Sequence, residues 1–394
     1  MAGTAVDSLE LAKASTEVAT AMIAVKNAIS VVESLEKLAS AAGATGAIFG
    51  VAAAIVKLAL GNVESEELRY MKEQFQIVRN KLDIISDQVQ QVLRAIEQST
   101  VNNQYFPIEV NLKNQFRKYM DILNATAEFR ENEKQEFLTH FNATKGDQNL
   151  HTLFDAVMGY SAVFGKPILE TAMEYDQRNR RLIEGLCSHL KELFCIGLIA
   201  LVGHSAITGT DVEALKTEWN EKMAKVDSKM KSMIDRCINE FANQVEIDVK
   251  KMLNERGGRN NCECASYILG GLLKKYDWIN WSVRVYNPVH TFKNHWVNGY
   301  NRFDLFRHNG VNAVVSFAID PKPIDKSYIR KLMEGKDGWS DAREVAEHVY
   351  NNLPSGHVVH VVRRYKGLWY HGNFPADCHF WENYSGVTLC VHST

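Results

Sequence analysis

The chain has 394 residues, of which 46% are hydrophobic and 23% charged, and its formal net charge is −2. This length is enough for two or three domains, each with a hydrophobic core of ordinary globular composition. The nearly balanced charge excludes the strongly basic or acidic chains that attract nucleic acid or anionic membranes through net charge alone.

The amino terminus and the cysteines indicate a reducing environment. Residues 1–13, MAGTAVDSLELAK, lack the basic and apolar segments of a secretory signal. The seven cysteines are an odd number, which favours free thiols over a disulfide framework. We therefore expect a cytoplasmic protein, with secretion by another route or membrane association left open.

The first distinctive segment is a run of nineteen residues without a charge, Leu38–Val56, rich in Ala and Gly. Small residues recur at every fourth position, as in helices that approach closely within membranes. A helix of this length would span about 28 Å, close to the bilayer core of about 30 Å. Ala and Gly give little insertion energy, so conditional insertion is expected rather than a permanent span, and a buried helix is the alternative. The candidate inserting positions are Ala42, Gly46, Ile48, Phe49, Gly50, Val51 and Ala54.

Long amphipathic helices are predicted around this segment. Apolar residues alternate at spacings of three and four from Leu68 to Ile96, which is the repeat of a coiled-coil seam and predicts one uninterrupted helix. A second such seam follows Thr210 and Asp211, runs from 212 to 237, and continues less regularly to 252. Shorter helices are predicted at 108–139, 147–163 and 167–204. The pattern indicates a bundle of long antiparallel helices.

A second apolar run occupies Leu193–Ile207 and is more hydrophobic than the first. Its candidate membrane-inserting positions are Leu193, Phe194, Ile196, Leu198 and Leu201. A buried helix surrounded by its neighbours would have the same composition. Two apolar segments flanked by long amphipathic helices favour the membrane interpretation, because an α-helical pore former needs both.

The composition changes near Arg256: two prolines precede it and five follow it. Proline is disfavoured inside helices, so the later part is expected to be mixed. Short β-branched runs predict strands at 282–286, 311–318, 357–362 and 388–392, and helices are predicted at 327–334 and 341–351. We therefore predict a long-helix bundle over residues 1–256, with apolar segments at 38–60 and 193–207, followed by a compact α+β module over 259–394.

The second module is rich in tryptophan. Exposed Trp with nearby Lys or Arg suits recognition of a glycan, a lipid headgroup or a protein, although each residue has a core role as its alternative. The candidate recognition face comprises Trp278, Trp281, Trp296, Trp339, Trp369 and Trp381.

Chemistry-bearing motifs are sparse. Cys262 and Cys264 lack the spacing and the second pair of a zinc site, which Cys378 and Cys390 do not supply. No phosphate-binding glycine loop is present, so neither a metal nor a cofactor is expected. One enzymatic alternative is a Cys/His hydrolase, with Cys262 or Cys264 at a helix start and His357 or His360 on a later strand.

Several long segments resemble the rapunzel family of fish proteins, which is similar to the cephalotoxin-like proteins of invertebrates. They are FRKYMDIL (116–123), GDQNLHTLFDAVMG (146–159), GKPILE (165–170), LCSHLKELFCIGLIALVG (186–203) and DVEALKTEWNEKM (211–223). The resemblance covers most of residues 45–240. It implies no enzymatic activity and no catalytic residues, a tie to fin and skeletal development, and an architecture similar to α-helical pore-forming toxins.

We therefore expect a non-enzymatic, membrane-active protein of the α-helical pore-forming type. It would be a soluble monomer that inserts its apolar segments and self-associates on a lipid membrane or at a membrane receptor. Nucleic acid is not an expected partner. The alternative is a soluble scaffold, with a developmental role, that binds protein partners.

Overall fold

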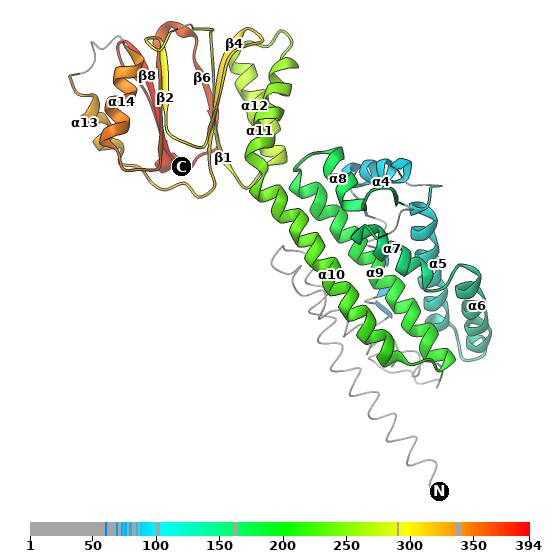
Figure 1. The fold of residues 1–394 in the computed structure, drawn as a ribbon. Helices are drawn as coiled ribbons and strands as arrows, with labels where there is room; N and C mark the ends of the chain where they lie inside the picture. The colour runs from blue at the N-terminus through cyan, green and yellow to red at the C-terminus, as the bar shows by residue number, and fades with distance from the viewer. Residues whose placement is uncertain are drawn as a thin grey trace. The chain divides into compact units, whose positions relative to one another are not determined.

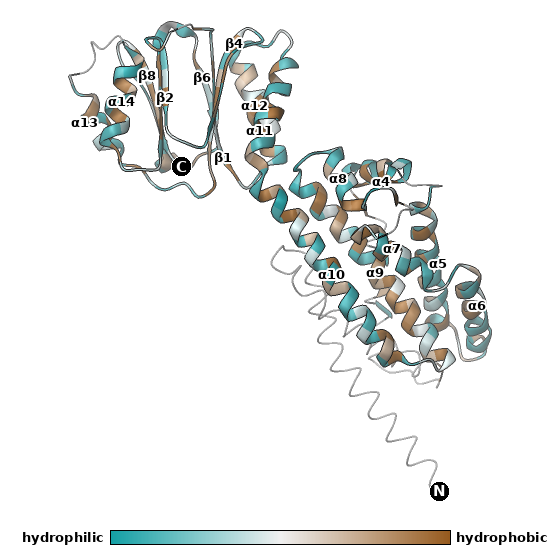
Figure 2. Ribbon diagram, in the orientation of Figure 1, coloured by the Kyte–Doolittle hydropathy of each residue, from teal (hydrophilic) through white to brown (hydrophobic). Residues whose placement is uncertain are grey.

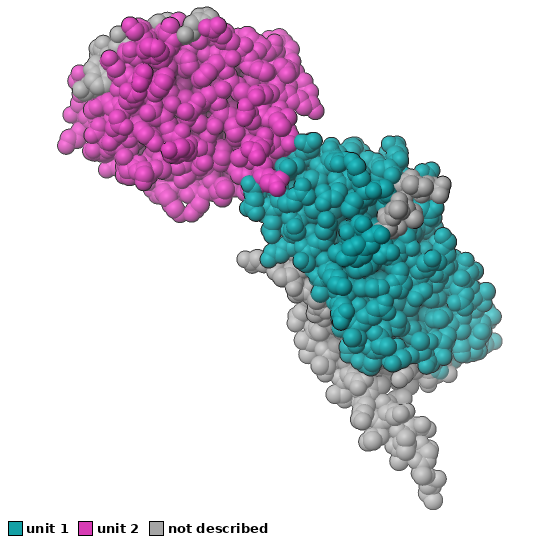
Figure 3. Space-filling view, in the orientation of Figure 1, with its two compact units in different colours: residues 1–239 teal, residues 240–394 magenta. Residues whose placement is uncertain are grey.

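The computed structural model describes residue 60, scattered positions between 68 and 85, and residues 87–99, 103–160, 164–289, 291–335 and 341–394. The first apolar segment, with its small-residue positions from Ala42 to Ala54, lies outside the described residues. The chain divides into two compact units, residues 1–239 and 240–394 (Figure 3). This division lies ahead of the predicted boundary at 256, because the last helix before Arg256 packs against elements of the second unit.

Unit 1 is a helix bundle with α9 at its centre. α9 contacts each of the other helices from α4 to α10, including α6, whose Phe141 ring stacks on His204 of α9 (Figure 1). The Asn179 side chain caps its start by accepting from Leu182 N–H, and Gly209, in the left-handed region, ends it. The described helices are α4 (Asp87–Ser99), α5 (Tyr105–Asn124), α6 (Arg130–Ala143), α7 (Gln148–Met158), α8 (Ile168–Tyr175), α9 (Arg180–Thr208) and α10 (Val212–Asn239).

The prediction of one uninterrupted helix over 68–96 was wrong. Ile84 and Ile85 are not helical, Ile84 is 82% exposed, and α4 begins only at Asp87. The seam residues on both sides of the break, such as Phe75 and Val92, are nevertheless buried in the same core. The apolar repeat therefore predicts which side chains are buried, but not that the helix is continuous. The Asp87 carboxylate in the first turn of α4 favours a new helix start there.

The second predicted seam is confirmed as α10, whose buried face includes Trp219, Met223 and Val226. Its expected continuation to residue 252 is a separate helix, α11 (Phe241–Asn254), which begins after Glu240. The predicted helix at 108–139 is divided between α5 and α6, and the one at 167–204 between α8 and α9.

Unit 2 contains two four-stranded antiparallel sheets with helices on their outer faces (Figure 1). The first sheet has the order β3-β4-β1-β6 and the second β2-β5-β8-β7. The strands are β1 (Asn280–Tyr286), β2 (His295–Asn298), β3 (Arg302–His308), β4 (Val311–Ala318), β5 (His357–Arg363), β6 (Trp369–Gly372), β7 (His379–Asn383) and β8 (Val387–Ser393).

The helices of unit 2 cover each sheet from outside. α11 and α12 (Asn261–Lys275) pack on the first sheet, α14 (Ala342–Asn352) packs on the second, and α13 (Lys326–Met333) packs on α14. A capping box between Asn260 and Glu263 starts α12. The four predicted strands are confirmed as β1, β4, β5 and β8, and the two predicted helices as α13 and α14. The predicted class, a helix bundle followed by an α+β domain, is therefore correct.

Alternation along β1 assigns its side chains to two layers. Trp281, Val283 and Val285 pack toward α11 and α12 in one apolar cluster. Ser282, Arg284 and Tyr286 alternate with them and therefore face the second sheet. Both sets are fully buried. The space between the two sheets is therefore closed to solvent, although polar side chains line it.

Candidate functional site

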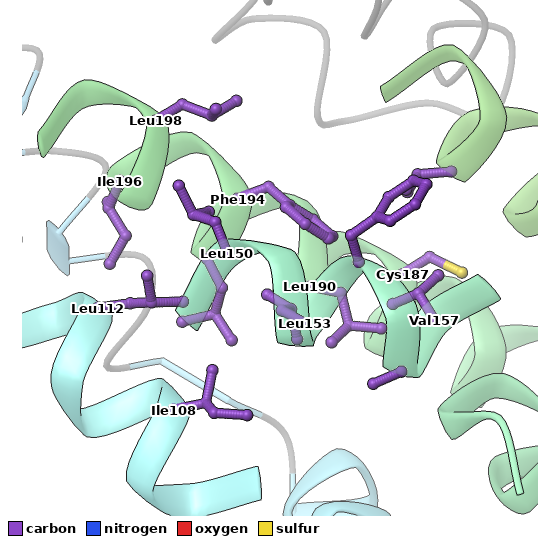
Figure 4. Packing of buried hydrophobic residues seen from close by; sticks show 14 of the residues in the cluster. Ile108, Leu112, Leu150, Leu153, Val157, Cys187, Leu190, Phe194, Ile196 and Leu198 are labelled. Carbon is purple, nitrogen blue, oxygen red and sulfur yellow. The ribbon is translucent and has the colours of Figure 1, made fainter. Parts of the chain in front are cut away.

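The described candidate for a membrane-active segment is α9. It is the helix, within the described part of the chain, that is long and apolar enough to cross a membrane, with a mean hydropathy of 1.6 over 18 residues (Figure 2). All the candidate inserting positions on it, Leu193, Phe194, Ile196, Leu198 and Leu201, are buried. Figure 4 shows Phe194 and Ile196 beside Leu112 of α5 and Leu150 of α7. The segment thus crosses the centre of the bundle core.

Two glycines let α9 approach its neighbours closely. A Cβ atom on Gly203 would lie 2.3 Å from Cε2 of Tyr119, and one on Gly197 would lie 2.6 Å from Cδ2 of Leu150. Both distances are below any van der Waals contact, so the neighbours occupy the space that a side chain would need. The small residues of this apolar helix are used for packing inside the bundle.

Polar contacts also hold α9 in place. His189 Nε2 lies 3.3 Å from the Glu109 carboxylate of α5, and Lys113 pairs with the same carboxylate at 2.7 Å. Burial by itself raises the pKa of Glu109, but the hydrogen bonds and charges of His189 and Lys113 outweigh it and lower the pKa to about 2. Lys191 forms an ion pair with Asp227 of α10. Exposing α9 would break the contacts of His189 and Lys191, whereas the Lys113–Glu109 pair lies within α5.

The predicted recognition face is not one surface. Trp281 is fully buried, and Trp278 packs with Phe241 in the cluster beneath α11 and α12. Trp296 packs instead with the α13–α14 cluster. Trp369 is 51% exposed, and Trp381 is half-buried on Tyr370. Trp339 lies outside the described residues. Aromatic density in this module therefore serves mainly to fill separate cores on opposite sides of the two sheets.

The predicted pairing of Cys262 or Cys264 with His357 or His360 is not formed. Cys264 of α12 is buried in the cluster between this helix and the first sheet, and burial raises its pKa. His360 faces the interior between the sheets, whereas the ring of His357 contacts the Pro354 carbonyl. Half-buried Cys262, in the first turn of α12, lies 3.4 Å from Nε2 of His371 on β6 instead.

A second Cys–His contact joins residues that sequence reasoning did not combine. Cys390 of β8 lies 3.4 Å from Nε2 of His379 on β7, and Arg284 of β1 approaches the same sulfur. We define the inter-sheet layer as the buried polar side chains at this place. They are Ser282, Arg284, Ser316, His379, Cys390 and His392. Within the described residues, no group of three or more His, Cys, Asp or Glu side chains is placed to hold a metal ion.

The layer did leave a signal in the sequence. In β8, polar Thr388, Cys390 and His392 alternate with apolar residues, as Ser282 and Arg284 do in β1. Such alternation ordinarily indicates one solvated face. Here the other sheet covers that face. The sequence of one strand does not show that a second sheet will pack on it.

Two comparisons with known proteins identify the family of the chain. A sequence model of the cephalotoxin-like middle helical domain matches residues 61–258. Protein rapunzel of Danio rerio is 40% identical over 209 residues, which cover 53% of this chain and 92% of that protein. Neither name denotes an enzyme. No solved structure matches this chain. The chain thus belongs to the rapunzel and cephalotoxin-like family.

Proposed function

We propose that this chain is a membrane-active helical protein whose α9 contacts lipid after the bundle opens. The observation that carries the proposal is the apolar length of α9. α9 has 29 residues, and its second part, from Leu193 to Thr208, contains no Asp, Glu, Lys or Arg. The whole helix spans about 43 Å and its charge-free part about 24 Å, against a bilayer core of about 30 Å, so a spanning segment would include the turns before Leu193.

The central burial of α9 is that of an ordinary core helix and by itself counts against insertion, so lipid contact would have to be conditional rather than permanent. In the folded bundle the window of highest hydropathy is 72% buried. A core helix has the same composition, so hydropathy alone favours neither role. Insertion would exchange helix–helix contacts for lipid contacts and would first break the contacts of His189 and Lys191. The bundle must therefore separate α9 from α5 and α10 before lipid can replace them.

Two further parts of the proposal rest on the sequence. The run Leu38–Val56 would join α9 as a second lipid-contacting segment, with Gly46 and Gly50 allowing close helix approach. Membrane-bound copies would then self-associate. The cephalotoxin-like name of the matched domain is consistent with this activity, whereas the name of the Danio rerio relative says nothing about membranes.

The test is dye release from vesicles of phosphatidylcholine, with and without phosphatidylglycerol, at neutral and mildly acidic pH. We expect release together with co-flotation of the protein. Ala206→Asp places a charge at a half-buried position of α9, which should disturb the folded bundle less than a charge at a fully buried position would. A carboxylate in a spanning helix costs about 2.5–3.5 kcal/mol at its centre and less toward its end, so release should fall about tenfold or more.

Val110→Asp is the matched control, because it makes a similar change at a 52% exposed position of α5 outside the apolar segment. It should leave release unchanged. If the unmodified protein neither binds nor permeabilises any of these vesicles, the membrane proposal fails and the protein-binding scaffold remains. Equal release by both variants would exclude α9 as the inserting helix.

A further inference from the structure

The inter-sheet layer of unit 2 places a buried charge where a sandwich usually has apolar side chains. Arg284 is 0% exposed, and no other member of the layer is more than 8% exposed. A guanidinium stays protonated at any ordinary pH, so burial cannot neutralise it. A buried charge without a counter-charge is strongly unfavourable. The partners of Arg284 therefore decide what the layer can do.

One end of the guanidinium contacts an uncharged pair, Ser316 hydrogen-bonded to His392. His392 Nδ1 lies 2.7 Å from the Ser393 carbonyl oxygen, so Nδ1 carries the proton and donates it there. Burial and the nearby Arg284 charge hold the pKa of His392 well below its usual range, so the ring is neutral and Nε2 accepts. The Ser316 hydroxyl donates to Nε2 at 2.6 Å, and its oxygen accepts from Arg284 Nη2. This end supplies no negative charge.

The other end of the guanidinium contacts Cys390. Nη1 lies 3.2 Å from Sγ. Among the residues that the structure describes, no ion pair joins Arg284 to a carboxylate, and the Asp304 carboxylate of β3 pairs with Arg302. The sulfur is therefore the group in contact with Arg284 that can become an anion.

His379 adds a second donor to the same sulfur. Its Nε2 lies 3.4 Å from Cys390 Sγ and 3.4 Å from Ser282 Oγ. The Tyr370 ring stacks on the imidazole with centroids 4.5 Å apart and packs it beside the sulfur. Burial by itself raises the pKa of the Cys390 thiol, but the charges and hydrogen bonds of Arg284 and His379 outweigh it and bring the pKa to about 6.

We propose that Cys390 is held as a thiolate by Arg284 and His379 and is a site of oxidation by small hydroperoxides, hydrogen peroxide above all. The thiolate is the nucleophilic form of cysteine. Cys390 is only 1% exposed, so a large or charged reagent is excluded. His379 is the most exposed member of the layer and lies behind half-buried Tyr370 and Trp381 of the edge strands β6 and β7, so we place the entry of a small uncharged oxidant on that side.

The reaction balances with groups already in the layer. The Cys390 thiolate attacks one peroxide oxygen, the O–O bond breaks, and a sulfur–oxygen bond forms. The departing hydroxide takes up a proton through the His379 ring and leaves as water. Sulfur loses two electrons to the peroxide and becomes a sulfenic acid. Because that product is neutral, Arg284 loses its counter-charge, and oxidation should weaken the contact between the sheets.

The first experiment detects the thiolate without needing access to it. The ultraviolet thiolate absorbance of the full chain is compared with that of Cys390→Ser between pH 4 and 9. A difference should already be present at pH 7 and should disappear toward pH 4. If the difference appears only above pH 8, Cys390 is an ordinary thiol and the proposal is overturned.

The second experiment measures oxidation site by site. The native full chain receives hydrogen peroxide, catalase removes the excess, and the chain is unfolded with dimedone, which traps sulfenic acids. Peptide mass spectrometry should show Cys390 trapped much faster than buried Cys264 and Cys378, whose pKa values burial raises. Trapping at Cys390 that is no faster than at these two internal controls would overturn the proposal.

Variants identify the groups that maintain the thiolate. If Arg284→Gln returns the thiol to the pKa of a free cysteine, the thiolate fraction at pH 7 falls about thirtyfold, and oxidation should slow accordingly. Arg284→Lys keeps the charge and should retain most of the rate. If Arg284→Gln does not fold, His379→Gln gives the same comparison, since it removes the proton donor at a more exposed position. Unchanged oxidation in a folded variant of either type would contradict the proposed roles.

Discussion

The close approach of α9 to α5 makes a sharp prediction for Gly203→Ala. The added Cβ would lie 2.3 Å and 2.5 Å from two ring carbons of Tyr119. Tyr119 is fully buried, and its ring contacts those of Phe75 and Phe137, with centroids 6.4 Å and 6.0 Å away. The ring cannot move by the required ångström without displacing a second aromatic side chain. The substitution should therefore force the two helices apart.

The magnitude follows from two opposing contributions. Replacing Gly by Ala within a helix gains about 1 kcal/mol of intrinsic helix propensity. Forcing a methyl group into a packed core costs about 1–3 kcal/mol, and the two ring contacts place this site at the upper end. We expect a net loss of about 2 kcal/mol, which lowers the melting temperature of a unit this size by about 4–8 °C.

Gly185→Ala provides the matched control on the same helix. Its Cβ would meet a single methyl group, Val89 Cγ2, at 3.0 Å, so most of the propensity gain should survive. Guanidinium unfolding followed by helical circular dichroism measures both variants. Because the propensity gain is shared, their difference reports the steric cost. If Gly203→Ala is as stable as Gly185→Ala, the close packing of α9 on Tyr119 is refuted.

Three further predictions concern other parts of the chain. Glu109→Gln removes a carboxylate whose pKa is lowered from 4.5 to about 2. The carboxylate therefore contributes at most about 3 kcal/mol to the free energy of unfolding above pH 4.5, and this contribution fades as the pH falls toward 2. Urea unfolding should show a smaller loss of stability in the variant at pH 3 than at pH 7, and an equal loss would contradict the ion pair. Asn260→Ala should destabilise unit 2 by about 1 kcal/mol in thermal unfolding through loss of the α12 cap, whereas Asn260→Asp should be neutral. Gly299→Ala would place Cβ 2.2 Å from the His357 carbonyl oxygen at a φ of +107°, and should lower the stability of unit 2 by at least about 2 kcal/mol. The control Gly270→Ala has open space around it and should raise the stability by about 1 kcal/mol. Calorimetry that shows both variants alike would contradict the close backbone approach at Gly299.

Local patterns in the sequence predicted the elements well where one apolar face meets one core. The seam that became α10 and the β-branched runs that became β1, β4, β5 and β8 are of this kind. The repeat at 68–96 misled because side chains on either side of Ile84 enter the same core without a continuous helix between them. Strands β2 and β6 have four residues each, and strands this short carry too little alternation to detect.

The candidate sites were predictable to different degrees. The burial and helicity of α9 follow from its composition, whereas lipid contact is a property of a second state that composition alone does not distinguish from a core role. Cys390, His379 and Arg284 come together only because β1 belongs to one sheet and β7 and β8 to the other. No spacing along the chain encodes that juxtaposition, since Arg284 and Cys390 are 106 residues apart.

The interleaved strand order of unit 2 has a consequence for folding. The chain passes from one sheet to the other between β1 and β2, returns before β3, crosses again between β4 and β5, and then changes sheet at each of the next two strands. Neither sheet is therefore formed from one continuous stretch of the chain. Unit 2 should melt in a single cooperative transition and refold slowly, because its decisive pairings join distant residues. A protease cut in any loop between β2 and β6 would leave strands of both sheets on each of the two fragments.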